Sequence, residues 1–432
     1  MKKLHPFISF LTAALLLLIS ANTLSQNCIY TWQAQNSGTN GQLGTVKAVS
    51  DSICWMGGGL GTIRRTTNGG ANWIDANPSP SILSAAILNI EALDGNRAWV
   101  AASTTNGGTT FIYRTTNGGL NWQNVYSSSQ TMIFGIKMIN ATSGFAFGNP
   151  SSNVWQMLVT VNGGQSWSLS PNAPPSQSII ETCLPNSFQV ALPNIWWGTS
   201  ITTIYRSTNS GVNWSSHEAN VSGIYIQAIH YNSPELGLSS SISMSKSTNG
   251  GINYAGLPVP GAGNIEGIEG EGDDFWFVRG TGIYMSTNAG SSWTQVYTAA
   301  QSLLHMDFPD GITGCQTGWA VGYGGVVYKL TSSVTGVNLL NSEVPVNYEL
   351  NQNYPNPFNP QTVINFSIPQ AGFTELKIYD ILGSEAANLV SGEMNAGNYS
   401  VTYSPGNISS GVYFYTLTSG SFIQTKKMLI VK

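Results

Sequence analysis

The sequence predicts an all-β protein in two parts, a ring of repeated four-stranded sheets followed by a small antiparallel β-sandwich. Three observations support this: the composition, a glycine-rich string that occurs six times, and a change of pattern after Leu330. Only 8% of the 432 residues are charged, and Ser, Thr, Asn, aromatic residues and 48 Gly are abundant. Such a composition favours strands and tight turns over helices. At this length we expect two or three domains.

The charge balance argues against a nucleic-acid partner. The chain has 20 acidic and 16 basic residues, a formal net charge of −4, and the basic residues form no stripe. Nucleic-acid binding draws much of its affinity from clustered basic residues that neutralise phosphates.

Residues 1–25 have the features of a secretory signal peptide. Two lysines precede an apolar run over residues 7–19, which is too short to span a bilayer comfortably. We expect cleavage after Ser25. No later stretch is long and apolar enough for a membrane helix, so we expect an exported protein with no transmembrane segment in its mature form.

Four cysteines follow the signal peptide: Cys28, Cys54, Cys183 and Cys315. Export permits disulfides, and four cysteines allow three connectivities, which the sequence leaves open. There is no C-x-x-C and no Cys/His ligand spacing, so we expect no metal site.

A string of eight residues that ends in an aromatic residue occurs six times, and we call it the box. The copies read TTNGGANW, TTNGGLNW, TVNGGQSW, STNSGVNW, STNGGINY and STNAGSSW. They end at Trp73, Trp122, Trp167, Trp214, Tyr254 and Trp293, so consecutive copies lie 39 to 49 residues apart. In a strand-rich chain this period is typical of β-propeller blades, each a four-stranded sheet.

A second series lies about 20–25 residues before each box and predicts the innermost strand of every blade. The strings are TVKAV, NIEAL, GIKMI, IIETC, YIQAI, NIEGI and LLHMD. Their central polar residues are Lys47, Glu91, Lys137, Glu181, Gln227, Glu266 and His305. Seven inner strands against six boxes predict a seven-bladed β-propeller. We expect Tyr30–Gln35 to supply the missing outer strand of blade 7, since such closure removes free sheet edges.

The box is interpreted as structural. Asn-Gly and Gly-Gly supply the positive φ angles of a tight turn. The asparagine side chain can accept hydrogen bonds from loop amides, and the aromatic residue can fill the gap towards the next blade. The residues given this role are Asn68, Trp73, Asn117, Trp122, Asn162, Trp167, Asn209, Trp214, Asn249, Tyr254, Asn288 and Trp293.

The box series resembles the Asp-box (BNR) repeat, S/T-x-D-x-G-x-T/S-W, of sialidase-like propellers. GWAVGYGGVVYK (Gly318–Lys329) is most similar to seven-bladed propellers of the photosystem II stability-factor type. The resemblance covers about residues 27–335, and we place the propeller at 26–335. All six boxes carry Asn where the family usually has Asp. Because Ca²⁺ prefers carboxylates, we expect no metal at the boxes and no cofactor.

Residues 336–347 are low in structure signals and predict a linker, followed by a second domain at 348–432. NYPNPFNP (Asn353–Pro360) cannot be a helix or a central strand. The alternating segments TVINFSI, TELKIYDI, NYSVTY, GVYFYTLT and QTKKMLIVK predict a small Ig-like antiparallel sandwich.

The order of these motifs resembles the type A C-terminal sorting domain of the type IX secretion system. The residues that carry the resemblance are Tyr354, Pro355, Asn356, Pro357, Phe358, Asn359 and Pro360, with Lys426, Lys427 and Lys432 in or after the last strand. It implies the type IX secretion machinery as a partner and a Bacteroidota-type bacterium as the source. It also implies removal of this domain, with the remainder surface-attached or released. The alternative is an ordinary cell-surface sandwich.

The arginines argue against a sialidase, which needs an arginine cluster for the substrate carboxylate. Arg65, Arg114 and Arg206 occupy one repeat position just before the box, where other blades have Lys, Met or Val. A position that accepts Met and Val is a strand surface rather than a carboxylate clamp.

A glycosidase with two catalytic carboxylates would need paired acids across a cleft. Glu91, Glu181 and Glu266 are the best-placed acids, but their series also contains Lys47 and Lys137. An inter-blade ring of ion pairs is therefore the competing interpretation. Pairing with lysines would favour a binding protein, whereas two carboxylates 5–10 Å apart at an open channel mouth would favour a hydrolase.

Ligand binding is expected on the face formed by the loops between second and third strands, opposite the box loops. We place Trp155, Trp196, Trp197, Arg279 and Tyr323 there, since the tryptophans break the box register. They could stack on sugar rings or anchor a protein, or simply cover loops. The sequence thus predicts an exported binding or scaffold module for an extracellular glycan or protein. The alternative is a glycoside hydrolase, sialidase-like or polysaccharide-degrading, acting on extracellular glycans.

Overall fold

The computed structural model describes residues 27–77, 85–104, 108–178, 181–310, 316–341, 344–405 and 408–431. The predicted signal peptide, Cys315 and Lys432 lie outside these ranges. The chain divides into two compact units between Ser333 and Val334, and each is described by itself.

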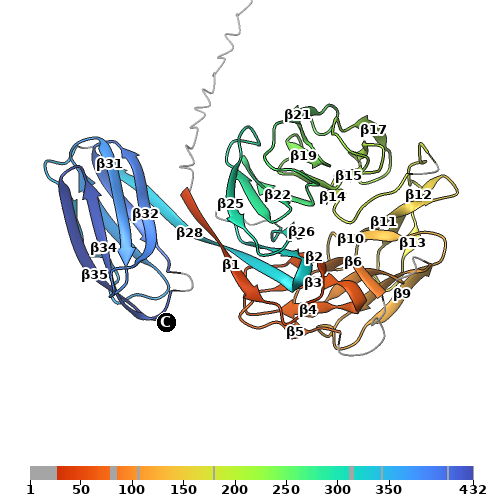
Figure 1. Ribbon diagram of the computed structural model, residues 1–432, viewed down its shortest axis with the longest axis horizontal. Coiled ribbons are helices and arrows are strands. Elements are labelled where there is room, and N and C mark those ends of the chain that lie inside the picture. Colours follow the sequence, from red (N-terminus) through yellow and green to blue (C-terminus); the bar gives the residue numbers. More distant parts are fainter. Residues whose placement is uncertain are drawn as a thin grey trace, which may run out of the picture. The chain divides into compact units, whose positions relative to one another are not determined.

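The first unit is a β-propeller whose blades follow one another in sequence order around a central axis (Figure 1). Blades 1 to 3 are β2 (Leu43–Ala48), β3 (Cys54–Gly58), β4 (Ile63–Thr66), β5 (Ile74–Asp75); β6 (Ala85–Ala92), β7 (Ala98–Thr104), β8 (Thr110–Thr115), β9 (Gln123–Ser128); and β10 (Ile133–Met138), β11 (Gly144–Ser151), β12 (Val154–Thr160), β13 (Ser168–Leu169). Blades 4 to 6 are β14 (Phe188–Ala191), β15 (Asn194–Gly198), β16 (Thr203–Ser207), β17 (Ser215–Glu218); β18 (Ala228–Tyr231), β19 (Gly237–Ser240), β20 (Met244–Ser247), β21 (Ala255–Leu257); and β22 (Gly267–Glu271), β23 (Asp274–Arg279), β24 (Gly282–Ser286), β25 (Thr294–Thr298).

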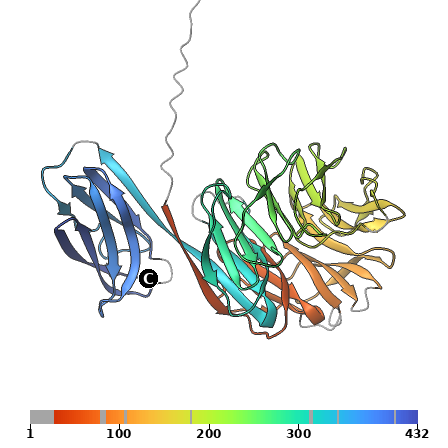
Figure 2. The ribbon, with the colours of Figure 1, turned by 45° about the horizontal axis from the view of Figure 1, so that its top comes forward.

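Blade 7 closes the ring with the beginning of the chain. It contains β26 (Leu303–Asp307), β27 (Gly318–Gly322) and the first part of β28 (Val326–Asn341), and β1 (Asn27–Asn36) pairs with β28. Figure 2 shows β1, in red, alongside β28, in cyan. The predicted seven-bladed, N-terminally closed fold is therefore correct. Two short 3₁₀ helices, η1 (Gly59–Gly61) and η3 (Tyr323–Gly325), connect second and third strands in blades 1 and 7.

The six boxes form the turns between third and fourth strands, with one recurring set of hydrogen bonds. In blade 1 the Thr66 hydroxyl donates to Asn68 Oδ1 (3.0 Å) and accepts from the Gly70 amide (2.9 Å), while Asn68 Oδ1 accepts from the Asn72 amide (3.0 Å). Gly69 and Gly70 have φ angles of 69° and 85°, a region that favours glycine. The other five boxes repeat these contacts.

The aromatic residue of each box packs against the preceding blade, not the next one as we expected from sequence. Trp122 of blade 2 joins a cluster with Trp55 and Ile63 of blade 1, and its indole N–H donates to the Ala76 carbonyl (2.8 Å). The box turn directs the aromatic side chain backwards, towards the preceding blade in the chain. Among the described residues one apolar cluster occupies each of the seven interfaces.

Trp32 of β1 takes the place of a box tryptophan at the interface between blades 6 and 7. It is buried, with 6% of its surface exposed, and lies in a cluster with Trp276 and Phe308. The strand that closes the ring by hydrogen bonding thus also completes the last apolar interface.

The C-terminal unit is an antiparallel sandwich. Residues 336–341 of β28 pair with β33 (Gly397–Tyr403), followed in the same sheet by β30 (Thr362–Ile368) and β29 (Glu349–Leu350). The second sheet contains β32 (Glu385–Met394), β31 (Gly372–Tyr379), β34 (Gly411–Ser419) and β35 (Phe422–Ile430). The expected linker at 336–347 therefore begins as strand, because its first residues find a partner in β33.

The NYPNPFNP segment is bound to the sandwich by its side chains. Phe358 is buried in the core, and Asn356 Oδ1 accepts from the Leu429 amide (2.9 Å) near the end of β35. Asn353, the first residue of the motif, is buried and donates to the Thr362 hydroxyl (2.9 Å). Tyr354 is exposed. The prolines are thus accommodated outside the strands, in a segment that side chains secure.

We predict that Trp32→Ala destabilises the propeller by about 3–5 kcal/mol, the usual cost of truncating a buried tryptophan. The residue closes the last interface without belonging to any box. Urea unfolding followed by tryptophan fluorescence measures the effect, and Gln33→Ala, an exposed neighbour on the same strand, should change stability by less than about 0.5 kcal/mol. Equal effects of the two substitutions would contradict the closure role.

Candidate functional site

The inner strands of the seven blades surround a cavity of about 190 Å³ on the propeller axis. Each inner strand contributes at least one polar residue to its lining. At one equivalent position in every blade this polar residue lies directly opposite a second-strand residue, which is Trp in five blades. We call these seven residues the channel ring: Lys47, Glu91, Lys137, Gln189, His230, Glu269 and Asp307.

The structure places the predicted Lys47, Glu91 and Lys137 in the ring, and the predicted His305 also lines the cavity beside Asp307. The predicted Glu181, Gln227 and Glu266 do not line it. In blades 5 to 7 the ring positions are His230, Glu269 and Asp307, two or three residues after the predicted Gln227, Glu266 and His305. Each of these inner strands has at least two polar residues in it or directly before it, and aligning the apolar strings selects one that precedes the ring position. In blade 4 the inner strand begins at Phe188, well after the string that contains Glu181.

Polar side chains of the inner strands join several blades to their neighbours. Glu91 Oε1 accepts from the Met138 amide (3.3 Å), and Asp307 Oδ2 accepts from the Ala48 amide (2.6 Å) of blade 1. Three side chains that are not ring members also accept a backbone amide of the next blade. The Ile90 amide donates to Thr45 Oγ1 (3.2 Å), the Ile136 amide to Asn89 Oδ1 (2.9 Å) and the Val46 amide to His305 Nδ1 (3.1 Å). Since an inner strand is a sheet edge, these bonds satisfy backbone amides that would otherwise lack a partner.

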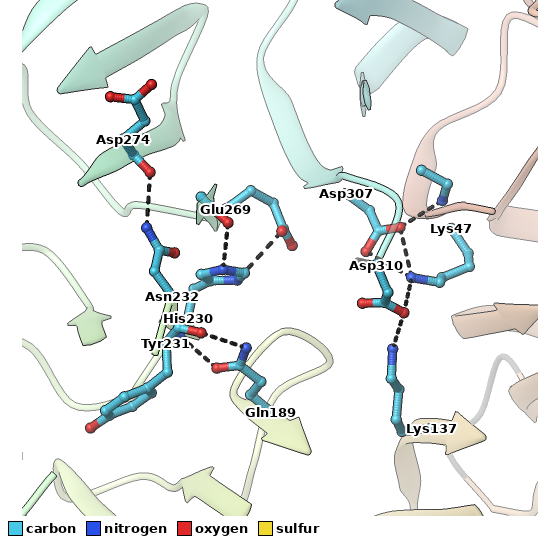
Figure 3. A network of polar contacts seen from close by, with 12 residues as sticks. Lys47, Lys137, Gln189, His230, Tyr231, Asn232, Glu269, Asp274, Asp307 and Asp310 are labelled. Carbon is cyan, nitrogen blue, oxygen red and sulfur yellow. Dashed lines mark hydrogen bonds and ion pairs between the residues drawn. The ribbon is translucent and has the colours of Figure 1, made fainter. Parts of the chain in front are cut away.

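An ion cluster occupies one side of the channel (Figure 3). Lys47 Nζ lies 3.1 Å from Asp307 Oδ2 and 3.4 Å from Asp310 Oδ2, and Lys137 Nζ lies 2.7 Å from Asp310 Oδ2. The Lys47 side chain is 7% exposed, whereas that of Asp310 is 72% exposed. Lys47 and then Lys137 hold the pKa of Asp310 well below its ordinary value. Burial raises the pKa of Asp307 despite its pairing with Lys47.

Glu91 lies close to this cluster but forms no ion pair within 4 Å among the described residues. Burial raises its pKa to about 7, against the lowering effect of Lys137 and Lys47. Near neutral pH this carboxyl therefore exists in both protonation states.

The other side of the channel holds a neutral pair. His230 Nδ1 lies 3.4 Å from Glu269 Oε2, and His230 Nε2 lies 3.2 Å from the Gly270 carbonyl, to which it donates (Figure 3). Burial lowers the pKa of His230 to about 4 and raises that of Glu269 well above its ordinary value. An uncharged imidazole facing a protonated carboxyl fits both shifts.

Glu181 and Glu266 lie apart from the ring. Glu181 is buried beside blade 4, where it accepts from the Gln177 amide (2.6 Å) and from the Thr199 (3.3 Å) and Tyr205 (3.3 Å) hydroxyls. Glu266 lines a shallow depression beyond the ring, and burial raises its pKa. Asn186 lines both this depression and the channel, and it donates to the Glu266 carbonyl (2.8 Å).

The predicted ligand-binding aromatics are mostly core residues. Trp155, Trp196 and Trp197 are 0% exposed, so they cannot present a ring to a ligand. Arg279 is also buried and donates to the carbonyls of the loop at 260–261 and of Ile242. Only Tyr323, 48% exposed, lies on the surface as expected.

Trp196 belongs to a repeat that the sequence analysis missed, the second-strand residue opposite the ring. Its other tryptophans are Trp55, Trp99, Trp276 and Trp319. Aligning the second strands, CWMGG, AWVAA, IWWG and GWAVG, would have revealed it.

The basic residues before the boxes join blades rather than bind substrate. Arg65 lies 5.4 Å from the Trp55 ring and donates to the Gly95 carbonyl of blade 2. Arg114 donates to the Gly163 carbonyl of blade 3 (2.9 Å), and Lys246 donates to Ala289 of blade 6 (3.0 Å).

The cysteines offer no reactive thiol or metal centre in the described part of the chain. Cys28 is disulfide-bonded, and Cys54 and Cys183 are free but buried. Burial raises the pKa of the Cys183 thiol to about 12. The described residues contain no group of three His, Cys, Asp or Glu side chains arranged to hold a metal ion. None of their helices has the length and apolar character needed to cross a membrane.

Comparison with known proteins identifies the C-terminal unit. Residues 352–432 match the family described as the secretion system C-terminal sorting domain. The chain therefore carries such a domain, which implies export by type IX secretion to the cell surface or the surroundings. No curated protein matches the chain.

Solved structures resemble the propeller in fold. YCF48 from Cyanidioschyzon merolae is 18% identical over 69% of this chain and 98% of its own, with a TM-score of 0.54. YCF48 bound to D1 peptide is 16% identical over 69% of this chain and 96% of its own, with a TM-score of 0.54. The GH74 enzyme of Niastella koreensis is 13% identical over 91% of this chain and 74% of its own, with a TM-score of 0.52. At these identities the likeness establishes the fold alone.

We predict that Glu91→Gln removes a pH-dependent loss of stability. The unfolded chain releases this proton near pH 4.5 and the folded chain near pH 7, so the folded state binds more protons between these values. The free energy of unfolding therefore falls as pH rises through this window, by up to about 3 kcal/mol. Gln keeps the acceptor for the Met138 amide but cannot ionise, so its stability relative to wild type should rise with pH.

Urea unfolding of both proteins across this pH range measures the difference. His230 and His305, whose pKa values burial lowers, are present in both proteins and cancel. Glu235→Gln, an exposed glutamate outside the channel, should follow wild type at every pH. A stability difference between Glu91→Gln and wild type that stays constant with pH would show that Glu91 does not titrate in this range.

Proposed function

We propose that this chain is an exported, non-catalytic binding or scaffold module whose propeller holds an extracellular partner. In this proposal residues 1–25 are a signal peptide, the boxes are BNR repeats in which Asn replaces Asp, and the source is a Bacteroidota-type bacterium. The type IX machinery recognises the C-terminal domain and removes it, so that the propeller stays on the cell surface or is released.

The observation that carries the proposal is that the channel carboxylates are already engaged in hydrogen bonds and ion pairs within the propeller. Glu91 and Asp307 accept backbone amides of the next blade, and Asp310 pairs with two lysines. Glu181 holds a loop, and Glu266 lies beyond the ring. A glycosidase needs two carboxylates available to substrate. Here the channel carboxylates instead bond to neighbouring blades. YCF48 bound to D1 peptide offers a precedent in fold for a propeller that holds a peptide.

A hydrolase remains the second candidate because of Asp307 and Asp310. Both carboxylates contact Lys47 Nζ, and their pKa values are shifted in opposite directions, as in acid–base pairs. The GH74 enzyme of Niastella koreensis shares the fold. Against this candidate, the channel cavity of about 190 Å³ is smaller than usual ligand pockets, about 300–1,000 Å³.

We predict that the purified chain binds extracellular polymers without cleaving them. Neutral polysaccharides and sialylated oligosaccharides are incubated with the protein, and released reducing ends or sialic acid are measured beside retention of each polymer. Asp310→Asn and the control Asp273→Asn, an exposed residue outside the channel, should match wild type. Turnover that is lost in Asp310→Asn alone would establish the hydrolase instead, and failure to bind any polymer, extracellular protein or cell surface would overturn the binding proposal.

A further inference from the structure

The connection between blades 3 and 4 departs from the repeat. It runs over residues 170–187 between β13 and β14. The corresponding connections cover 219–227 and 258–266 before blades 5 and 6, and only 129–132 and 299–302 before blades 3 and 7. Long connections inside a compact domain are usually functional. The later residues of this connection, such as Asn186, line the end of the channel. The role of its first residues is a separate question.

The first part of this connection forms one wall of a groove of about 440 Å³. Pro174, Pro175 and Gln177 belong to this wall, and Trp214 and Asn213 of the fourth box lie on the other side. Tyr205 of β16 also lines the groove. Its volume falls within the range of small-molecule sites, about 300–1,000 Å³, and exceeds that of the channel cavity.

The groove is held in place by buried contacts. The Pro174 carbonyl accepts from the Trp155 amide (3.1 Å), and the Pro175 carbonyl accepts from the Tyr205 hydroxyl (3.2 Å). Glu181, only 4% exposed, accepts from the Gln177 amide and the same tyrosine. A buried carboxylate is costly unless its oxygens are hydrogen-bonded, and the bonds that satisfy Glu181 fix this loop. Preformed walls lower the entropic cost of binding.

The chemistry of the lining is uncharged but polar. Aromatic and proline rings lie beside carboxamides and hydroxyls, and no Asp, Glu, Lys, Arg or His is among the lining residues. A charged ligand would enter without a counter-charge, which is unfavourable. A saccharide fits, because its ring face packs on aromatic side chains while its hydroxyls both donate to and accept from Asn, Gln and Ser.

We propose that this groove, between residues 172–177 and the fourth box, binds a neutral saccharide. The inference rests on the proposed binding function and locates it at the blade 3–blade 4 interface instead of the face that the sequence suggested. Trp214 is half-buried, as are the box tryptophans Trp73 and Trp293, so part of its ring remains accessible to a ligand in the groove.

The test is binding of the purified chain to a panel of neutral gluco-, manno-, galacto- and N-acetylglucosamine oligosaccharides, measured by calorimetry. Sialylated and uronic-acid oligosaccharides and proline-rich peptides form the comparison arms. We expect at least one neutral oligosaccharide to bind and Trp214→Leu to weaken it more than 10-fold. Asn213→Ala should weaken it roughly 2–10-fold, the loss of about one neutral hydrogen bond.

The matched control is Asn121→Ala, the same exposed box position in blade 2, which should leave affinity unchanged. The fold uses the backbone amide of Asn213, which donates to Asn209, and Asn213→Ala keeps this bond. This variant therefore still tests the proposal if Trp214→Leu unfolds. Unchanged affinity in Asn213→Ala, binding only of charged sugars or peptides, or binding of cell-surface polymers with none of the neutral panel would each overturn the groove proposal while leaving the binding function standing. Absence of binding to any extracellular polymer, protein or cell surface by the wild type would overturn both.

Discussion

The interface between neighbouring blades is the constraint on which the propeller depends. A single four-stranded sheet has two apolar faces and two edges, and it can bury neither face without a neighbour. The chain meets this need with aromatic clusters between the sheets at every interface and, at several interfaces, with polar side chains that accept backbone amides at the inner edge. Both recur with the period of the repeat.

This requirement gives the charged side chains of the channel a structural role. Buried ion pairs add little net stability, but breaking one is costly, and in some proteins such groups fix register. Lys47 contacts Asp307 and Asp310 of blade 7, while Lys137 reaches Asp310 from blade 3. The cluster thus connects the first and last blades across the closure, where a slip in register would be most damaging.

The sequence predicted the elements whose signal is periodic. Six boxes and seven apolar strings were sufficient for the blade number and for closure by β1, because each rests on many equivalent positions. Single positions were less predictable. Gln227 and His230 are both polar residues near or on one inner strand, and only pairing with the second strand distinguishes the channel residue. Trp196 was misplaced because exposure depends on packing against Tyr231 and its neighbours, which no local string records.

The departures from the repeat indicate where function should be sought. A residue that recurs from blade to blade serves blade packing, as the box asparagines do, and the arginines before three of the boxes likewise bond or pack within and between blades. The connection at 170–187 is longer than the equivalent connections at 219–227 and 258–266, and the blade 4 inner strand begins later than expected from the sequence. Glu181, which looked like a ring carboxylate, instead braces this connection. Local inconsistency with an otherwise regular fold marks functional segments in many proteins, and here the irregular segment and the uncharged groove coincide.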